Sequence, residues 1–212
     1  MGRMVNRVIK ILITSDFFLN CGWGLLSPVF AIFIVQKIAV GSPSEGAKIA
    51  GFAAFVYWVS KSLLQVPIGR YLDKDHGEID DFWFMVFGTF LSALSPLGFL
   101  ISTQPWHIYA LQVVHGVAMA FVVPSWSAIF TRHIDKDREA FEWSLESTFL
   151  GIAAGVTGAI GGLIAALFGF SVVFILVSFF NMISVFLLLS IKNNIFPTDH
   201  RFPRVPPIKP GF

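Results

Sequence analysis

Ionisable and amide side chains stand inside stretches of this sequence that are otherwise apolar. Where two share a stretch they are three or four positions apart, which places them on one face of a helix. Carboxyl and imidazole groups take up and release protons, whereas amide and ammonium groups hold a polar solute by hydrogen bonds or charge. These side chains are Asp16, Asn20, Lys61, Gln65, Gln112, His115 and Glu146.

Charges this deep in an apolar stretch need a compensating reason. An ionised side chain at the centre of a membrane helix costs roughly 2.5–3.5 kcal/mol on insertion scales. Asp16 and Lys61 have similar depths if both stretches are helices, so we expect them to pair, with Glu146 as the competing partner of Lys61. Three interpretations stay open: a salt bridge that only locks two helices, a site for a solute or a proton, or side chains that snorkel to the membrane interface. For His115, titration and a structural hydrogen bond are both open.

Six long apolar segments must position these side chains. Of the 212 residues, 55% are hydrophobic and 13% are charged, whereas soluble domains have about 25% charged residues. Each segment is long enough for a membrane-spanning helix, which needs roughly 20 residues, and backbone groups in lipid favour helices. The sequence therefore predicts an all-α membrane protein with six transmembrane helices, at about residues 8–36, 48–72, 82–102, 105–131, 143–167 and 168–191, with a turn at Gly169 between the last two.

The distribution of polar residues predicts which helices enclose a shared cavity. Strongly polar side chains fall in the first, second, fourth and fifth segments, so we expect the third and sixth to face lipid. Short similarities between 28–33 and 124–130, and between 51–54 and 151–154, favour two three-helix repeats of opposite orientation. The fifth segment has glycines spaced for close helix packing or for bending: Gly151, Gly155, Gly158 and Gly162.

Basic residues predict the orientation of the helices. If the N-terminus is cytoplasmic, 12 of the 15 basic residues lie on the cytoplasmic side, only Lys37 and Lys48 lie outside, and Lys61 lies within the membrane. Positive charges concentrate on the cytoplasmic side of membrane proteins, so both termini should be cytoplasmic. Residues 192–212 contain five of the 11 prolines and are expected to form an extended cytoplasmic tail that ends the chain.

Other classes of site find little support in the sequence. The single cysteine, Cys21, provides no disulfide or zinc site by itself, and the five histidines lack metal-ligand spacing. No serine or cysteine nucleophile has a credible base beside it, so we expect neither an enzyme nor a bound cofactor or metal. A net charge of +2 gives no reason to expect a nucleic-acid partner.

The loop after the second segment carries a family motif. It reads GRYLDKDHGE, and Gly69, Asp73, Lys74 and Gly77 resemble the loop between the second and third helices of the major facilitator superfamily. The resemblance implies that this loop controls a conformational switch and that Asp73 caps a helix of the opposite half. The loop has one extra residue before Gly77, and acidic residues stand where the family has basic ones, so its charge relay should be rebuilt here.

Two later segments are also similar to that family. ALQVVHGVAMAFVVPSW resembles its fourth helix, with Gly116 and Pro124 in matching places, and GIAAGVTGAIGG resembles the glycine motif of its antiporters. The family's intramembrane arginine falls on Gln112, and a following glutamine falls on His115. These departures argue against proton coupling through that arginine.

The resemblance implies a fold and a function. The family has twelve helices in two halves, and this chain is similar to one half, with its 3+3 repeat. It would therefore be a secondary transporter that moves a small solute by alternating access, as a homodimer or with a second half-transporter; a fragment is the remaining case. The alternative is an accessory or scaffold subunit that does not transport. Either would be a multi-pass protein among the lipids of a bacterial inner (plasma) membrane, and neither substrate nor coupling ion can be read.

Overall fold

The computed structural model describes residues 5–74 and 77–196. Within these ranges, six helices are long and apolar enough to cross a membrane, which confirms the all-α prediction. A short π-helix, η1, follows the first, and one helical turn, α7, follows the last. The elements are α1 (Arg7–Phe33), η1 (Ile34–Ile38), α2 (Pro43–Leu72), α3 (Ile79–Phe99), α4 (Pro105–His133), α5 (Glu139–Phe168), α6 (Phe170–Ser190) and α7 (Lys192–Ile195).

Helix boundaries follow local chemistry that the apolar pattern does not reveal. Helix α2 begins at Pro43, five residues before the predicted start, because the Ser42 hydroxyl caps the backbone N–H of Glu45 at 3.4 Å and proline suits the first helical position. The predicted break between the last two helices is found at Gly169, whose φ of +84° suits a residue without a Cβ. Residues 192–195, expected to be extended, form α7, and 197–212 lie outside the described residues.

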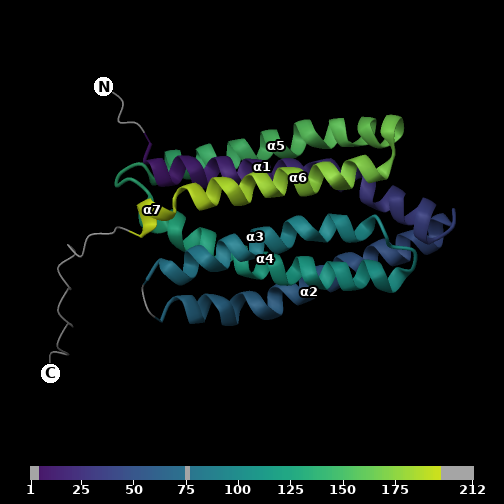
Figure 1. The fold of residues 1–212 in the computed structure, drawn as a ribbon, viewed down its shortest axis with the longest axis horizontal. Coiled ribbons are helices and arrows are strands. Elements are labelled where there is room, and N and C mark those ends of the chain that lie inside the picture. Colours follow the sequence, from purple (N-terminus) through teal and green to yellow (C-terminus); the bar gives the residue numbers. More distant parts are fainter. Residues whose placement is uncertain (1–4, 75–76, 197–212) are drawn as a thin grey trace.

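The helices pack in a pattern with internal symmetry. The main contacts join α1 to α5 and α6, α4 to α2 and α3, and α3 to α6. Exchanging α1 with α4, α2 with α5 and α3 with α6 leaves this set unchanged, as two three-helix repeats require. In Figure 1, α5 and α2 lie along opposite edges of the bundle, with α6 and α3 between them. The start of α1 and the short α7 lie at the same end.

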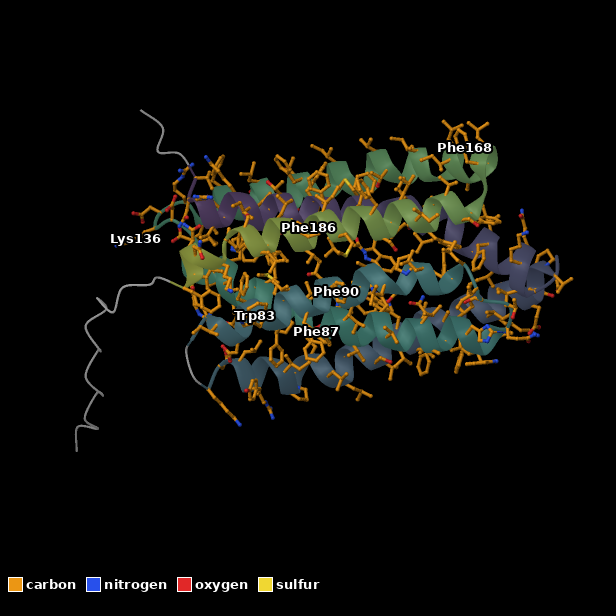
Figure 2. The ribbon with its side chains drawn as sticks, viewed as in Figure 1. Trp83, Phe87, Phe90, Lys136, Phe168 and Phe186 are labelled. Carbon is orange, nitrogen blue, oxygen red and sulfur yellow. The ribbon has the colours of Figure 1, made fainter. Side chains whose placement is uncertain are left out.

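The most exposed helices are α2 and α5, not the predicted third and sixth helices. We expected α3 and α6 to be the outer helices, yet 56% and 44% of their most apolar stretches are buried, against 11% for both α2 and α5. The reason is that α2 packs mainly on α4 and α5 mainly on α1, which leaves most of their surface uncovered. Helices α3 and α6 still present large apolar side chains such as Phe87, Phe90 and Phe186 at the surface (Figure 2).

Close packing of small residues holds the bundle together. A Cβ on Gly116 would lie 2.8 Å from the Tyr57 carbonyl oxygen, and one on Gly161 would collide with the backbone of Leu25. In lipid, such close approach stabilises helix pairs because burial from water contributes little. Of the four predicted packing glycines, only Gly158 has a neighbour in the described chain, the Gly24 carbonyl oxygen at 3.8 Å from a built Cβ. The space beside the others is open within the described chain: Gly151, Gly155 and Gly162.

Candidate functional site

A cavity of about 410 Å³ lies between α1, α2 and α4, and we call it the central cavity. Three of the polar residues singled out in the sequence line it together: Asn20, Gln112 and His115. Ser27 adds a hydroxyl group, and aromatic and aliphatic side chains form the rest of the wall. This mixture of apolar surface with a few converging polar groups is typical of small-molecule sites. Its other lining residues are Leu19, Trp23, Leu26, Phe30, Ala50, Ala54, Tyr57, Phe99 and Met119.

An aromatic stack forms one wall of the central cavity. The His115 imidazole is stacked between the Trp23 indole, with ring centroids 3.8 Å apart, and the Tyr57 phenol, with centroids 4.9 Å apart. A hydrogen bond fixes the position of the indole: Trp23 Nε1 donates to Ser92 Oγ of α3 at 3.2 Å. Buried Asn181 of α6 lies beside the same indole: in the amide orientation that satisfies both of its polar atoms, Oδ1 accepts from Trp23 Nε1 at 3.3 Å and Nδ2 donates to the Leu19 carbonyl oxygen at 3.3 Å. The stack is therefore positioned by four helices, α1, α2, α3 and α6, around a residue of α4.

His115 is buried, with 7% of its surface exposed, yet its Nδ1 has no hydrogen-bond partner among the described residues. Leaving a buried polar atom unpaired costs about 1–3 kcal/mol. The structural hydrogen bond that we left open as an explanation for His115 is therefore absent at Nδ1 within the described chain. Because the ring lines the central cavity, a solute there could provide the missing partner.

Lys61 lies one turn beyond Tyr57 on α2, close enough to His115 for the two to interact electrostatically. Its Nζ is 4.9 Å from the centroid of the Trp58 ring. The expected salt bridge with Asp16 is not formed, and no carboxylate pairs with Lys61 among the residues that the structure describes. The physical reason is that α1 and α2, although consecutive, are joined through η1 and pack on different partners.

Asp16 and Glu146 instead lie together where α1 packs against α5. Their carboxyl groups are close enough for their charges to interact. Only 8% of the Glu146 surface is exposed. Neither carboxyl group lines the central cavity, but Asn20, one turn along α1 from Asp16, does, and its Nδ2 donates to the backbone carbonyl oxygen of Asp16 at 2.9 Å. Gln65 is half-buried on α2 and does not line the central cavity.

Charged residues at the terminal end of the bundle form a third cluster, which we call the loop cluster. Asp81 at the start of α3 is fully buried and forms an ion pair with Arg132 at the end of α4. Arg132 also donates to the Gly77 carbonyl oxygen at 3.5 Å, and His133 lies 3.5 Å from Glu78. Basic side chains of α4 thus contact the acidic residues that follow the loop motif. These acidic residues stand where the family motif has basic ones, so the basic partners here come from another helix.

The predicted switch residues surround this cluster. Asp73 ends α2 as its C-cap and is exposed, as is Lys74. Gly69 and Asp73 line a cavity of about 410 Å³ that Pro124 and Arg132 of α4 also border. Burial raises the pKa of Glu78, although the charges of His133 and Arg132 act to lower it. The switch role of Gly69, Asp73, Lys74 and Gly77 stays a prediction.

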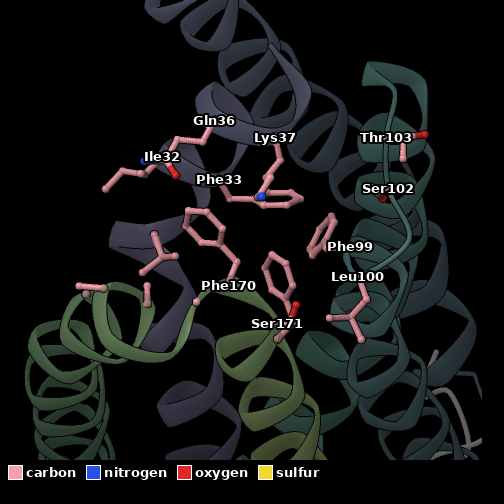
Figure 3. A pocket seen from close by; sticks show the side chains of 16 residues that line it. Ile32, Phe33, Gln36, Lys37, Phe99, Leu100, Ser102, Thr103, Phe170 and Ser171 are labelled. Carbon is pink, nitrogen blue, oxygen red and sulfur yellow. The ribbon is translucent and has the colours of Figure 1, made fainter. Parts of the chain in front are cut away.

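A larger cavity, of about 820 Å³, lies at the far end of the bundle between α1, α3, α5 and α6. Figure 3 shows Phe33, Phe99 and Phe170 around it, with Lys37 from η1 at its edge. Phe99 also lines the central cavity, so the two cavities share this side chain. No residue pattern in the sequence indicated the larger cavity, because helices distant in sequence form it.

Trp23, which packs against His115 in the aromatic stack, was not among the predicted site residues. Trp23 follows Asp16 and Asn20 at spacings of four and three, which continues their helical face and could have identified it. Nothing in the sequence near Ser92 or Asn181 signals that they hold this indole. Among the described residues, no group of three or more His, Cys, Asp or Glu side chains is arranged to bind a metal ion.

Comparison with known proteins agrees with this architecture. The family model described as Major Facilitator Superfamily matches residues 12–210, nearly the whole chain. A search of curated proteins finds no match. The match covers α1 from residue 12 onward, the five other long helices, the loop motif and the residues of the central cavity. The chain belongs to the major facilitator superfamily, a family of transporters, and has the six-helix fold of one of its halves.

Proposed function

We propose that this chain is a half-size secondary transporter that moves a small solute by alternating access as a homodimer. The observation that carries the proposal is the central cavity, where Asn20, Gln112 and His115 converge between α1, α2 and α4, and where His115 Nδ1 has no hydrogen-bond partner among the described residues. Polar groups inside a membrane bundle are costly and mark solute or ion pathways. Following the distribution of basic residues, the termini lie in the cytoplasm, and the protein belongs in a bacterial inner membrane.

The uncovered edges of the bundle support the homodimer. Helices α2 and α5 each have 11% of their most apolar stretch buried, and Gly151 and Gly155 of α5 leave open space for a close neighbour. These helices lie on opposite edges (Figure 1). A twofold axis along the membrane normal would place α2 of one copy against α5 of the other and would give the cavity a second wall.

The acidic pair supports coupling to protons. Two adjacent carboxyl groups can share one proton and release it when their surroundings change. The carboxyl groups of Asp16 and Glu146 are close enough for their charges to interact, and Asn20, one turn along α1 from Asp16, lines the central cavity. We assign proton binding to this pair and solute binding to the central cavity.

Flux measurements in proteoliposomes test the transport proposal. An imposed pH gradient should drive solute-dependent proton movement, followed with an internal pH dye, across a panel of small organic acids, amides and amines. Asp16→Asn and Glu146→Gln should each reduce this movement at least tenfold, whereas Glu45→Gln, which changes an exposed acid outside the pair, should not. Full activity in the Asp16→Asn, Glu146→Gln double variant would remove the pair from the mechanism. No flux for any compound would favour an accessory subunit.

Disulfide cross-linking in native membranes tests the dimer. Val59 of α2 and Ile152 of α5 are 37% and 52% exposed, and at a rise of about 1.5 Å per residue each lies roughly 20 Å from the terminal end of its helix. In a Cys21→Ser background, Val59→Cys and Ile152→Cys expressed together should give a cross-linked dimer. Phe179→Cys, on the α6 surface, serves as the matched control and should give none. Equal cross-linking of the control, or none for the pair, would contradict the dimer.

A further inference from the structure

We propose that the solute of the central cavity is an organic anion with a flat aromatic body and that Lys61 attracts its charged group. The inference rests on the proposed function and specifies the class of substrate. It follows from the charges around the cavity, the shape of its wall and its volume, which are independent features of the structure.

The wall of the central cavity has no acidic side chain among its described residues, so an organic cation would find no counter-charge in the wall. The carboxyl groups of Asp16 and Glu146 do not line the cavity and are close enough to each other for their charges to interact. On the other side of the cavity, Lys61 interacts with His115, which is part of the wall.

Lys61 lacks a negative partner inside the described chain. The ion pairs there join Glu45 to Lys48, Asp81 to Arg132, Glu78 to His133 and Asp135 to Arg138. Lys61 lies about 16 Å from the nearer end of α2, at 1.5 Å per residue, and is half-buried. An uncompensated ammonium group at this depth is costly, and an anionic solute would neutralise it.

The wall suits a flat apolar group. Trp23, Phe30, Tyr57 and Phe99 line the cavity with aromatic rings, and the ring of His115 is already stacked between two of them. Aromatic rings prefer offset-stacked or edge-to-face neighbours. The side chains of Asn20, Ser27 and Gln112 could orient polar substituents. A volume of about 410 Å³ is within the range of small-molecule pockets, roughly 300–1,000 Å³.

Ligand-induced thermal stabilisation of the purified full chain tests the inference directly. Benzoate, phenylacetate and indole-3-acetate are the anionic probes, benzamide is the neutral analogue of benzoate, and benzylamine is the cationic one. We expect at least one carboxylate to stabilise the protein with an apparent affinity at least tenfold higher than benzamide, and benzylamine to have no effect. Quenching of tryptophan emission by the same carboxylate should weaken in Trp23→Phe.

Variants of Lys61 assign the charge recognition. Lys61→Gln should lower the affinity for the carboxylate at least tenfold and leave benzamide unchanged, whereas Lys61→Arg should stay within threefold of the unmodified protein. Lys48→Gln is the matched control, because Lys48 is exposed and pairs with Glu45, and it should bind normally. Stabilisation by none of the carboxylates, equal stabilisation by benzamide, preference for benzylamine, or normal binding by Lys61→Gln would each overturn the inference.

The outcomes separate this inference from the proposed function. Lys61-dependent binding of a carboxylate without flux in proteoliposomes would contradict transport and leave the anion site intact. Flux of an amine or amide that no aromatic carboxylate inhibits would support transport and overturn the anion site.

Discussion

The charged residues at the terminal end of the bundle differ from those deeper within it, on α1, α2 and α5. In the loop cluster each acid has a base: Asp81 pairs with Arg132, and Glu78 with His133. Farther along, Lys61 has no acid among the described residues, and Asp16 has another carboxyl group, that of Glu146, as its neighbour. Both regions contain buried ionisable groups, but of the two only the loop cluster has ion pairs among the described residues.

We infer from this difference that the paired charges of the loop cluster serve stability, whereas the charges without opposite partners serve function. Removing one partner of a buried ion pair leaves an uncompensated charge and destabilises a protein. An uncompensated charge that is already present lowers stability, and such groups concentrate where a site needs them for binding or proton transfer. We therefore expect substitutions in the two regions to change stability in opposite directions.

The largest expected effect comes from Arg132. Arg132→Gln leaves the fully buried Asp81 without its partner and should lower the free energy of unfolding by about 3 kcal/mol. The measurement is unfolding of the purified protein in mixed micelles with increasing SDS. Adding Asp81→Asn should recover part of the loss, because the unpaired buried charge is then gone.

Lys48→Gln, which breaks an exposed pair, should cost less than about 1 kcal/mol. An Arg132→Gln effect no larger than this control would mean that the loop cluster is not a structural lock.

A substitution that removes the charge of Lys61 should change the free energy of unfolding in the opposite direction. Lys61→Met keeps the length of the side chain and removes the unpaired charge, so it should raise the free energy of unfolding by about 1 kcal/mol, part of the cost of a charge within the membrane. The same SDS titration measures this gain, and loss of carboxylate binding should accompany it. A destabilised Lys61→Met would show that the ammonium group has a compensating partner in the protein, and the contrast between the two regions would fail.

The sequence predicted the architecture well because the membrane imposes it. Helix number and approximate bounds follow from apolar length, and Gly169 follows from its place in an otherwise unbroken apolar run. Residues 43–47 were not assigned to α2 because they are polar and project beyond the apolar stretch, where Ser42 and Pro43 begin the helix. The pattern of hydrophobicity carries no information about such caps.

The site could be predicted only in part, because depth along a helix does not specify its neighbours. Asn20, Gln112 and His115 do meet in one cavity. The pairing of Asp16 with Lys61 was wrong, since similar depth brings groups together only if their helices pack, and α1 packs against α5 and α6 instead. The role of Trp23 depends on Ser92 of α3 and Asn181 of α6, which meet it only in the folded bundle.

The smallest expected effect is a pH dependence at Glu78, which refines the description of the loop cluster. Burial raises the pKa of Glu78 in the folded protein above its ordinary value of 4.5, against the opposing charges of His133 and Arg132. The stability that the protonated group contributes is therefore complete below about pH 4.5 and is lost as the pH rises through the folded-state pKa. Glu78→Gln, which stays neutral, should lack this loss. Relative to the variant, the unmodified protein should lose about 0.5 kcal/mol or less of its free energy of unfolding between pH 4 and pH 7, because partial exposure screens the charge.

SDS unfolding at both pH values measures the difference, with the exposed acid variant Glu45→Gln as control. A gain of stability over this range in the unmodified protein would mean that pairing with His133 and Arg132 outweighs burial and that the cluster is more strongly compensated than we infer.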